Sequence, residues 1–278
     1  MAGVLSGGVK RVITAFFLVP AVIFVVAYSA PFWLLAGVSA VILLALSEYN
    51  NLSVLPARSP AGDRLCVAAG AAMPSVFFFL GAGALMPAAL SAVFAFFLHG
   101  LWGGAEFKDA SYGACFRTLG VLYIAIPLSY LIFLRDMENG RWWILFIFAV
   151  IWANDTFAYI VGKSVGRHKL APRVSPGKTV EGAVGGLAAG AALSFFYDRY
   201  MGLGAGAMGI VLLALVIGVV GIAGDLAESL LKRGAGIKDS GTLIPGHGGV
   251  LDRIDSLIFP IPAVYYILIW QLHIKAAG

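Results

Sequence analysis

Residues 207–224 read AMGIVLLALVIGVVGIAG, an apolar run without a charge that leads directly into DLAESLLKR at residues 225–233. A helix of about 20 apolar residues is long enough to cross the roughly 30 Å hydrocarbon core of a bilayer. Charged side chains on such a helix face other protein or lie near its ends. The stretch therefore predicts a transmembrane helix whose charges are confined to its C-terminal end.

The rest of the chain is also rich in apolar residues and poor in charge. Its 278 residues include 19 Lys and Arg and 14 Asp and Glu, 33 charges in all, whereas a soluble domain of this length carries about 70. The composition is 60% apolar, and charge-free stretches also run from Val12 to Ser47 and from Leu65 to Ala105. One compact core cannot bury this much apolar surface, and the runs do not alternate as β-barrel strands do. We predict an all-α polytopic integral membrane protein.

Hydropathy and turn residues divide the chain into about nine transmembrane helices. They are expected near residues 12–28, 32–47, 65–80, 85–98, 118–134, 142–161, 179–197, 207–231 and 256–273. The first is interpreted as an uncleaved anchor, because further apolar spans follow it at once. We expect residues 1–140 to form an N-terminal set of about five spans. Residues 141–278 then form a catalytic region of about four spans with cytoplasmic loops at 163–178 and 232–255.

The distribution of positive charge predicts the orientation in the membrane. With a cytoplasmic N-terminus, the opposite side receives only Arg135, Arg141, Arg199 and Lys275, which leaves 15 of the 19 Lys and Arg residues on the cytoplasmic side. The C-terminus is then expected on the opposite side. A net charge of +5 reflects this topology, so we expect no nucleic-acid partner.

Charged residues return together at the end of the eighth predicted span. Five polar residues fall within about a 140° arc of that helix and form one face that cannot contact lipid, namely Asp225, Glu228, Ser229, Lys232 and Arg233. Farther along, Lys238 and Asp239 precede the turn PGHGG at 245–249, which contains His247, Gly248 and Gly249. Asp252, Arg253 and Asp255 follow, and the two carboxylates share one face of the helix that enters the last span.

This combination of residue types suits phosphate chemistry. Clustered carboxylates are typical ligands of Mg²⁺, which keeps other positions for water and substrate phosphate. Interleaved Lys and Arg suit the phosphate oxygens, and the glycine-rich turn lets backbone amides approach an anion. Lys178 and Thr179, in SPGKT at 175–179, open another span and are expected near the same cytoplasmic mouth. The pattern predicts phosphoryl or nucleotidyl transfer at the membrane surface.

Two further carboxylates, Asp155 and Glu181, lie within or at the edge of predicted spans, where an unpaired charge is costly. A functional role and a helix-packing role remain open for both. Gly182, Gly186 and Gly190 repeat every four residues, a spacing typical of close helix packing that also leaves a homodimer open.

The polar residues of the C-terminal part also resemble a known family. The run SLLKR at 229–233, then Lys238 and Asp239, then PGHGGVLDRID at 245–255 is similar to the motif of phosphatidate cytidylyltransferases, or CDP-diacylglycerol synthases. Upstream, SPGKTVEG at 175–182 and GDLAE at 224–228 also resemble that family. The resemblance covers roughly the C-terminal third to two-fifths of the chain.

The resemblance implies transfer of CMP from CTP to phosphatidic acid, which gives CDP-diacylglycerol and pyrophosphate with the help of a divalent metal. Residues expected in catalysis are Asp225, Ser229, Lys232, Lys238, Asp239, His247, Asp252, Arg253 and Asp255. Residues expected to bind substrate are Lys178, Thr179, Glu181, Glu228, Arg233, Gly248 and Gly249. Asp225, Asp252 and Asp255 are expected to hold Mg²⁺, with a second cation left open. His247 is expected to donate a hydrogen bond, and protonation of the leaving group ranks lower.

Other functions remain as alternatives. A CTP-dependent polyprenol or phytol kinase and an ether-lipid cytidylyltransferase would use similar residues. A secondary transporter fits less well, since no repeated halves are evident and the charges gather at one mouth instead of the bilayer midplane. We expect the membrane to be a bacterial inner membrane with the active site facing the cytoplasm.

Overall fold

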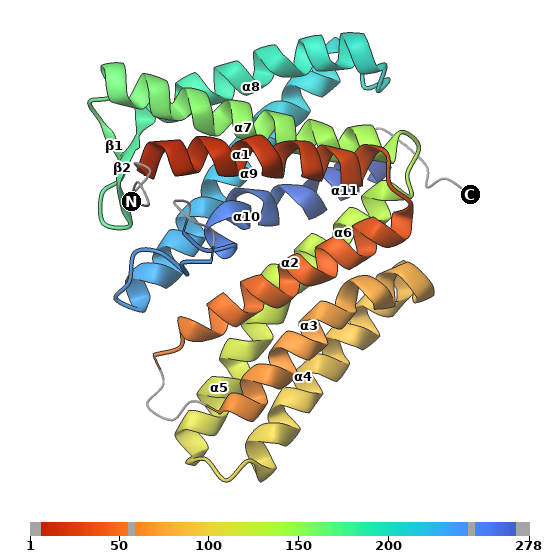
Figure 1. Cartoon of the computed structure of the whole chain (residues 1–278), viewed down its shortest axis with the longest axis vertical. Coiled ribbons are helices and arrows are strands. Elements are labelled where there is room, and N and C mark those ends of the chain that lie inside the picture. The colour runs from red at the N-terminus through yellow and green to blue at the C-terminus, as the bar shows by residue number, and fades with distance from the viewer. Residues whose placement is uncertain (1–6, 55–58, 244–247, 271–278) are drawn as a thin grey trace, which may run out of the picture. The chain divides into compact units, whose positions relative to one another are not determined.

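A computed structural model of the chain describes residues 7–54, 59–243 and 248–270 (Figure 1). Most of these residues are helical, and the only strands among them form one small hairpin. The elements in chain order are α1 (Gly7–Ala27), α2 (Pro31–Asn51), α3 (Pro60–Leu80), the 3₁₀ helix η1 (Ala82–Ala84), α4 (Leu85–Trp102), α5 (Phe107–Gly120), the π-helix η2 (Val121–Ala125), α6 (Ile126–Arg135), α7 (Gly140–Val165), β1 (Lys169–Ala171), β2 (Ser175–Thr179), α8 (Val180–Met201), α9 (Ala207–Gly234), α10 (Leu251–Ile258) and α11 (Pro260–Trp270).

The helices confirm the predicted all-α polytopic membrane class. Eight helical segments in the described part of the chain are long and apolar enough to cross a bilayer. They are Pro31–Asn51, Pro60–Leu80, Ala82–Trp102, Phe107–Arg135, Gly140–Val165, Val180–Met201, Ala207–Gly234 and Leu251–Trp270. Each overlaps one predicted span, and α1, of 21 residues, overlaps the first predicted span.

Several predicted boundaries differ from the structure, and two of them show how polar residues were mistaken for loop. The fifth span was predicted from residue 118, yet the helix begins at Phe107. Arg117 is buried there, and its guanidinium lies 3.3 Å from the Asp63 carboxylate of α3. The last span was predicted from residue 256, yet α10 begins at Leu251, and a break before Pro260 separates it from α11. In both places a tertiary contact or a helix cap, invisible to hydropathy, extends the helix.

The chain forms two compact units. The first comprises residues 1–133 and 235–253, and the second comprises residues 134–234 and 254–278. Each is thus built from two separate stretches of sequence. The chain crosses from the first to the second within α10, so that Asp252 belongs to the first unit and Asp255 to the second.

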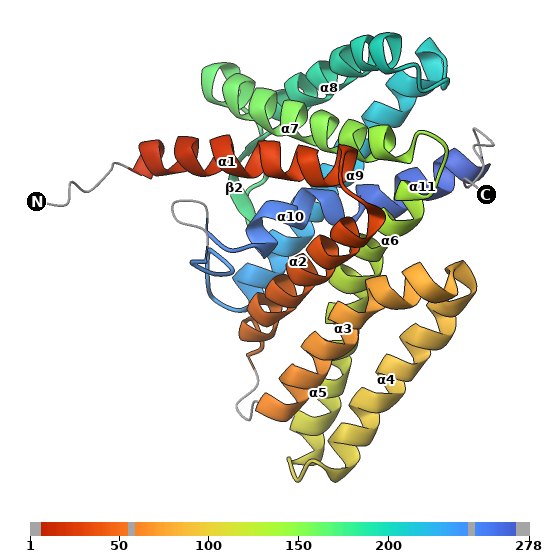
Figure 2. The same ribbon diagram turned by 45° about the vertical axis from the view of Figure 1, so that its right-hand side comes forward.

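In the first unit, α2 packs against α3, and α4 packs against both α3 and α5. The two views show α3 and α4 side by side (Figures 1 and 2). The C-terminal end of α2 is buried, with Leu46 and Tyr49 fully inside. The ring of Tyr49 stacks on Phe116 of α5 at a centroid distance of 4.4 Å. These contacts hold the end of α2 firmly against two neighbouring helices.

In the second unit, α7 and α8 pack along each other for most of their length, as both views show, and α8 also packs against α9. Small residues permit this approach. A Cβ on Gly186 would lie 2.5 Å from the Asn154 backbone oxygen of α7, and one on Gly182 would lie 2.7 Å from that of Ala158. The predicted glycine spacing therefore serves helix packing within the chain.

The predicted loop 163–178 contains more order than expected. α7 continues to Val165, and β1 pairs antiparallel with β2, with Lys169 opposite Thr179 and Ala171 opposite Ser175. This hairpin delivers residue 178 to the start of α8. The predicted loop 232–255 likewise overlaps helix at both ends, because α9 runs to Gly234 and α10 begins at Leu251.

Candidate active site

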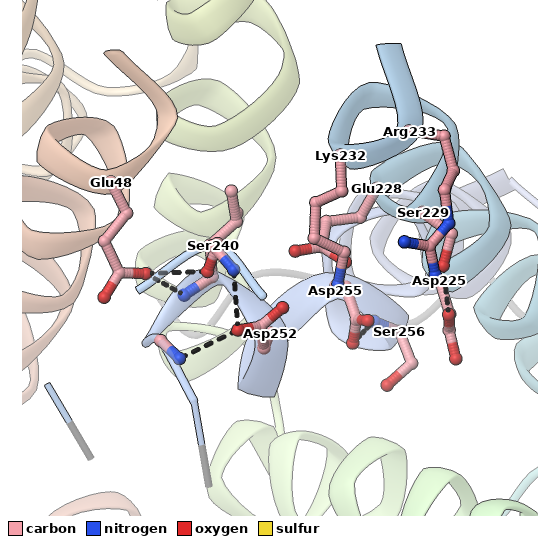
Figure 3. A network of polar contacts seen from close by, with 12 residues as sticks. Glu48, Asp225, Glu228, Ser229, Lys232, Arg233, Ser240, Asp252, Asp255 and Ser256 are labelled. Carbon is pink, nitrogen blue, oxygen red and sulfur yellow. Dashed lines mark hydrogen bonds and ion pairs between the residues drawn. The ribbon is translucent and has the colours of Figure 1, made fainter. Parts of the chain in front are cut away.

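The end of α9 carries the predicted polar face. Glu228 is fully buried and forms an ion pair with Lys232 one turn later, whose side chain is also buried. Ser229 donates a hydrogen bond from Oγ to Asp225 Oδ1 at 3.3 Å (Figure 3). Arg233 is exposed and donates from Nε to the Val174 backbone oxygen at 3.3 Å. The sequence-predicted face thus exists as a set of mutual contacts.

Lys178 joins this face from a different part of the chain. Its Nζ lies 2.5 Å from Asp225 Oδ2, and both side chains keep about a quarter of their surface accessible, 27% and 28%. The β1–β2 hairpin makes the contact possible, because it turns the chain back before α8 begins. Asp225 is therefore held by a hydroxyl of its own helix and by an ammonium group from β2.

Asp255 enters the same group from α10. Its residue surface is 9% exposed, and its Oδ1 accepts a hydrogen bond from the Ser256 N–H at 2.6 Å. The charges of Asp225, Lys232 and Asp155 all act on the Asp255 carboxyl group. Figure 3 shows Asp255 beside the labelled residues of α9. Two carboxylates and a buried ammonium are thus gathered within the second unit.

Close backbone contact between α9 and α10 explains this arrangement. A Cβ on Gly224 would lie 2.5 Å from the Asp255 backbone oxygen, and one on Gly221 would lie 3.1 Å from that of Ser256. Any larger residue at position 224 would push the two helices apart. The glycine just before Asp225 is therefore what lets the carboxylates of α9 and α10 approach each other.

Asp252 has a separate set of partners within the first unit. Its Oδ2 accepts hydrogen bonds from the Gly249 N–H at 2.8 Å and the Ser240 N–H at 3.0 Å (Figure 3). Gly248 has φ +82°, a left-handed conformation that favours glycine, and a Cβ there would lie 2.7 Å from Asp252 Oδ2. The predicted glycines Gly248 and Gly249 bring backbone close to a carboxylate of the protein itself.

Two residues of this region were missed by the sequence reasoning. Glu48, near the end of α2, accepts hydrogen bonds from the Val250 N–H, the Leu251 N–H and the Ser240 hydroxyl group, at 2.9, 2.9 and 3.1 Å. It is 8% exposed. A signal existed for Glu48, because it is the first charge after the stretch from Val12 to Ser47. Ser240 carried no comparable signal.

Thr179 and Glu181, both predicted to bind substrate, hold the start of α8. Thr179 is the buried N-cap residue, and its Oγ1 accepts from the Gly182 N–H at 3.1 Å. Glu181 accepts from the N–H groups of Arg167 and His168, at 3.0 and 3.2 Å, and its Oε1 lies 2.6 Å from His168 Nδ1. Both residues therefore stabilise the hairpin that positions Lys178.

The remaining predicted residues lie on the surface or outside the described residues. Lys238 and Asp239 are exposed in the segment between α9 and α10, and Arg253 is exposed on α10. His247 falls in 244–247, outside the described residues. Asp155 is exposed on α7, yet its charge interacts electrostatically with the Asp255 carboxyl group.

The side chains of the described ranges contain no group of three or more His, Cys, Asp or Glu residues arranged to hold a metal ion. What they do contain is the pair Asp225 and Asp255, on two helices that touch. Two carboxylates in a largely buried place repel each other unless a cation lies near, and oxygen ligands suit Mg²⁺. The pair fits a site in which water and phosphate oxygens complete the coordination.

The fold defines a polytopic helical membrane protein, and its polar cluster gathers carboxylates and an ammonium group near the end of α9. The sequence profile of the cytidylyltransferase family matches residues 9–270. Because this match covers nearly the whole chain, the protein belongs to the cytidylyltransferase family.

Individual relatives agree with this assignment. The chain is 42% identical over 154 residues to the phosphatidate cytidylyltransferase of Bacillus subtilis, covering 55% of this chain and 57% of that protein. It is 40% identical over 156 residues to the phosphatidate cytidylyltransferase of Staphylococcus epidermidis and over 160 residues to that of Staphylococcus aureus, each covering 56% of this chain and 59% of the relative. The chain thus spans somewhat less than three-fifths of the length of the curated relatives it matches.

Proposed function

We propose that the protein is a phosphatidate cytidylyltransferase, which transfers CMP from CTP to phosphatidic acid and releases pyrophosphate. The observation that carries the proposal is the meeting of Lys178, Asp225 and Asp255, from β2, α9 and α10, in a chain of the cytidylyltransferase family. Three separate segments supply opposite charges to one place at helix ends. Such an arrangement suits a polyanionic substrate that must be bound next to a bilayer.

The reaction needs charge neutralisation more than it needs a base. A phosphate oxygen of phosphatidic acid attacks the α-phosphorus of CTP, a new P–O bond forms, and the bond to the β-phosphate breaks. The phosphate is already an anion near neutral pH, so no proton has to be removed first. The difficulty lies in bringing two polyanions together and in stabilising pyrophosphate as it leaves.

The cations of the cluster are suited to that task. Lys178 lies beside Asp225 with about a quarter of its side-chain surface exposed, and we assign its ammonium group to a phosphate of the substrate. Lys232 is buried and paired with Glu228, and we assign it to holding the Glu228 carboxylate in place. Arg233, Lys238 and Arg253 are exposed, and we assign them to the phosphates of CTP and of the lipid.

We propose Asp225 and Asp255 as ligands of Mg²⁺, and Asp252 remains a ligand predicted from the sequence alone. When bound, the ion would neutralise phosphate charge and stabilise the departing pyrophosphate. Lys178 and Ser229 would hold the Asp225 carboxylate in its orientation through the contacts they already make with it. The predicted second cation belongs to the same proposal.

The charge distribution and the bacterial relatives support a proposal for the location. We propose a bacterial inner membrane, with the active site and the N-terminus on the cytoplasmic side, because 15 of 19 Lys and Arg residues would then lie there. Phosphatidic acid would be taken from the bilayer itself. The homodimer prediction gains nothing from the glycine spacing on α8, since α7 covers those glycines.

Product analysis tests the proposal directly. Purified protein in detergent micelles with phosphatidic acid, Mg²⁺ and CTP labelled at the α-phosphate should produce a labelled lipid that migrates as CDP-diacylglycerol. CTP labelled at the γ-phosphate should release labelled pyrophosphate and leave the lipid unlabelled. Label in the lipid from γ-labelled CTP alone would establish a kinase instead. Product formation from an ether lipid but not from phosphatidic acid would establish the ether-lipid enzyme.

A further inference from the structure

One buried carboxylate lies outside the proposed catalytic group. Glu48 belongs to α2, yet its side chain contacts the segment that leads into α10 about 200 residues later. We propose that Glu48 is a positioning residue, which fixes the turn at 248–251 and thereby orients Asp252. The inference rests on the proposed function only in its kinetic part, because the turn geometry can be measured without any substrate.

The backbone amides of the turn are divided between two carboxylates. The Gly249 N–H donates to Asp252 Oδ2, whereas the next two N–H groups, of Val250 and Leu251, donate to Glu48 Oε1 and Oε2. These amides belong to the start of α10, where N–H groups lack partners within the helix. A carboxylate at this end also interacts favourably with the helix dipole. Glu48 therefore acts as a helix cap supplied from another helix.

Ser240 connects the two carboxylates. Its hydroxyl group donates to Glu48 Oε2 at 3.1 Å, and its backbone N–H donates to Asp252 Oδ2 at 3.0 Å. Figure 3 shows Ser240 between the two acidic side chains. A displacement of Glu48 would thus be transmitted to Asp252 both through Ser240 and through the continuous turn at 249–251.

The surroundings leave Glu48 little freedom. A Cβ on Gly249 would overlap Ser240 Oγ and Glu48 Oε2, and one on Gly241 would lie 2.6 Å from Glu48 Oε1. The backbone of both glycines therefore forms part of the wall around this carboxylate. These close contacts restrict the orientations open to the Glu48 carboxylate.

The helix that carries Glu48 is anchored on both sides. The next residue, Tyr49, donates from its hydroxyl group to the Phe116 backbone oxygen of α5 at 3.1 Å. Asn50 donates from Nδ2 to the Asp63 backbone oxygen of α3 at 3.2 Å. Three successive residues at the end of α2 thus bind three different segments of the first unit. The turn is therefore attached to a helix end that α3 and α5 hold in place.

The experiment compares Glu48→Gln with Glu106→Gln, an exposed glutamate before α5 whose side chain makes no capping bond. Glutamine keeps the size of Glu48 but replaces one acceptor oxygen by an amide NH₂ that faces N–H donors. Hydrogen–deuterium exchange of peptides covering 248–256 should accelerate about 10-fold or more in Glu48→Gln, with other helices unchanged. Glu106→Gln should match the wild type.

Kinetics and metal binding supply the second readout. Glu48→Gln should raise the Mg²⁺ concentration for half-maximal activity, and the dissociation constant of Mn²⁺ measured by electron paramagnetic resonance, by about 10-fold, while KM for CTP changes less than about 2-fold. Unchanged exchange at 248–256 would overturn the proposal whether or not the protein makes CDP-diacylglycerol. Faster exchange throughout the chain would also overturn it, because Glu48 would then be only a stability residue.

A milder variant decides the matter if Glu48→Gln does not fold. Ser240→Ala removes the hydroxyl donor to Glu48 and leaves the backbone N–H that donates to Asp252. It should shift exchange at 248–256 and Mn²⁺ binding in the same direction, by about 2- to 5-fold. Wild-type values in both measurements would contradict the proposal.

Discussion

Lys178 Nζ lies 2.5 Å from Asp225 Oδ2, so that a residue of the β1–β2 hairpin contacts the end of α9, 47 positions later in the chain (178 to 225). The hairpin is small, yet it brings a cation to a carboxylate that hydropathy alone places at a membrane boundary. Thr179 and Glu181 fix the following helix start through their bonds to Gly182 and to the 167–168 backbone. The contact therefore depends on local capping as much as on charge.

Replacing Asp225 should remove activity without removing the protein. Asp225→Asn keeps the shape but loses the charge that faces Lys178 and Ser229. We expect kcat to fall at least about 100-fold, the scale on which one electrostatic group changes catalysis. CDP-diacylglycerol formation per amount of membrane-inserted protein measures the effect. Asp136→Asn, at an exposed carboxylate between α6 and α7, serves as control and should retain wild-type turnover.

Lys178→Ala should act mainly on nucleotide binding. A charge-assisted hydrogen bond contributes about 1.5–3 kcal/mol, which corresponds to roughly 10- to 100-fold in affinity. We therefore expect KM for CTP to rise by at least about 10-fold. The matched control is Lys169→Ala, an exposed lysine on the opposite strand of the same hairpin. An equal effect of both substitutions would show that the hairpin contributes only general positive charge.

Gly249→Ala should disturb the turn before α10. The added methyl group would overlap Glu48 and Ser240, and such overpacking costs about 1–3 kcal/mol. A lower midpoint of thermal unfolding in detergent, together with reduced turnover, is the expected result. Gly37→Ala is the control, since a Cβ at this α2 position meets nothing within 4 Å. A stable and active Gly249→Ala variant would contradict the described packing of the turn.

Arg117→Met should lower stability without changing the reaction itself. Arg117 is 6% exposed, pairs with Asp63 at 3.3 Å and lies against Gly62 and Gly113. Removal of one partner of a buried ion pair costs about 3–5 kcal/mol. We expect a lower unfolding midpoint and a smaller yield of folded protein, while kcat per folded molecule stays within about 2-fold. Lys108→Met, at an exposed lysine of the same helix, should leave both quantities unchanged.

Hydropathy was sufficient for the class and for the approximate position of the helices. A continuous apolar run such as 207–224 forms a helix in lipid, because a helix satisfies every backbone hydrogen bond within the segment. The polar face from Asp225 to Arg233 could also be predicted from the sequence, since residues three and four apart share a helix face. The contacts between Glu228 and Lys232 and between Ser229 and Asp225 follow that spacing.

Contacts between distant segments could not be predicted from the sequence in this way. Helical periodicity says nothing of which helix a polar face meets, so Lys178 beside Asp225 was expected only as a common location. Glu48 could have been noticed as a lone acid at the end of an apolar span. Its partners include backbone N–H groups, which almost every residue carries, so the sequence does not indicate which residues it binds. Arg117 was taken for a loop residue because a buried ion pair looks polar in sequence.

The sequence by itself determined a polytopic helical membrane protein and the polar face near the end of α9, because lipid excludes unpaired charge and helical spacing sets which residues share a face. The tertiary structure alone decided that Gly224 lets α10 bring Asp255 to α9, and that Glu48 and Ser240 hold the turn before Asp252. Those relationships depend on backbone approach and on amide donors. Both are properties of the folded chain that residue types and their spacing do not carry.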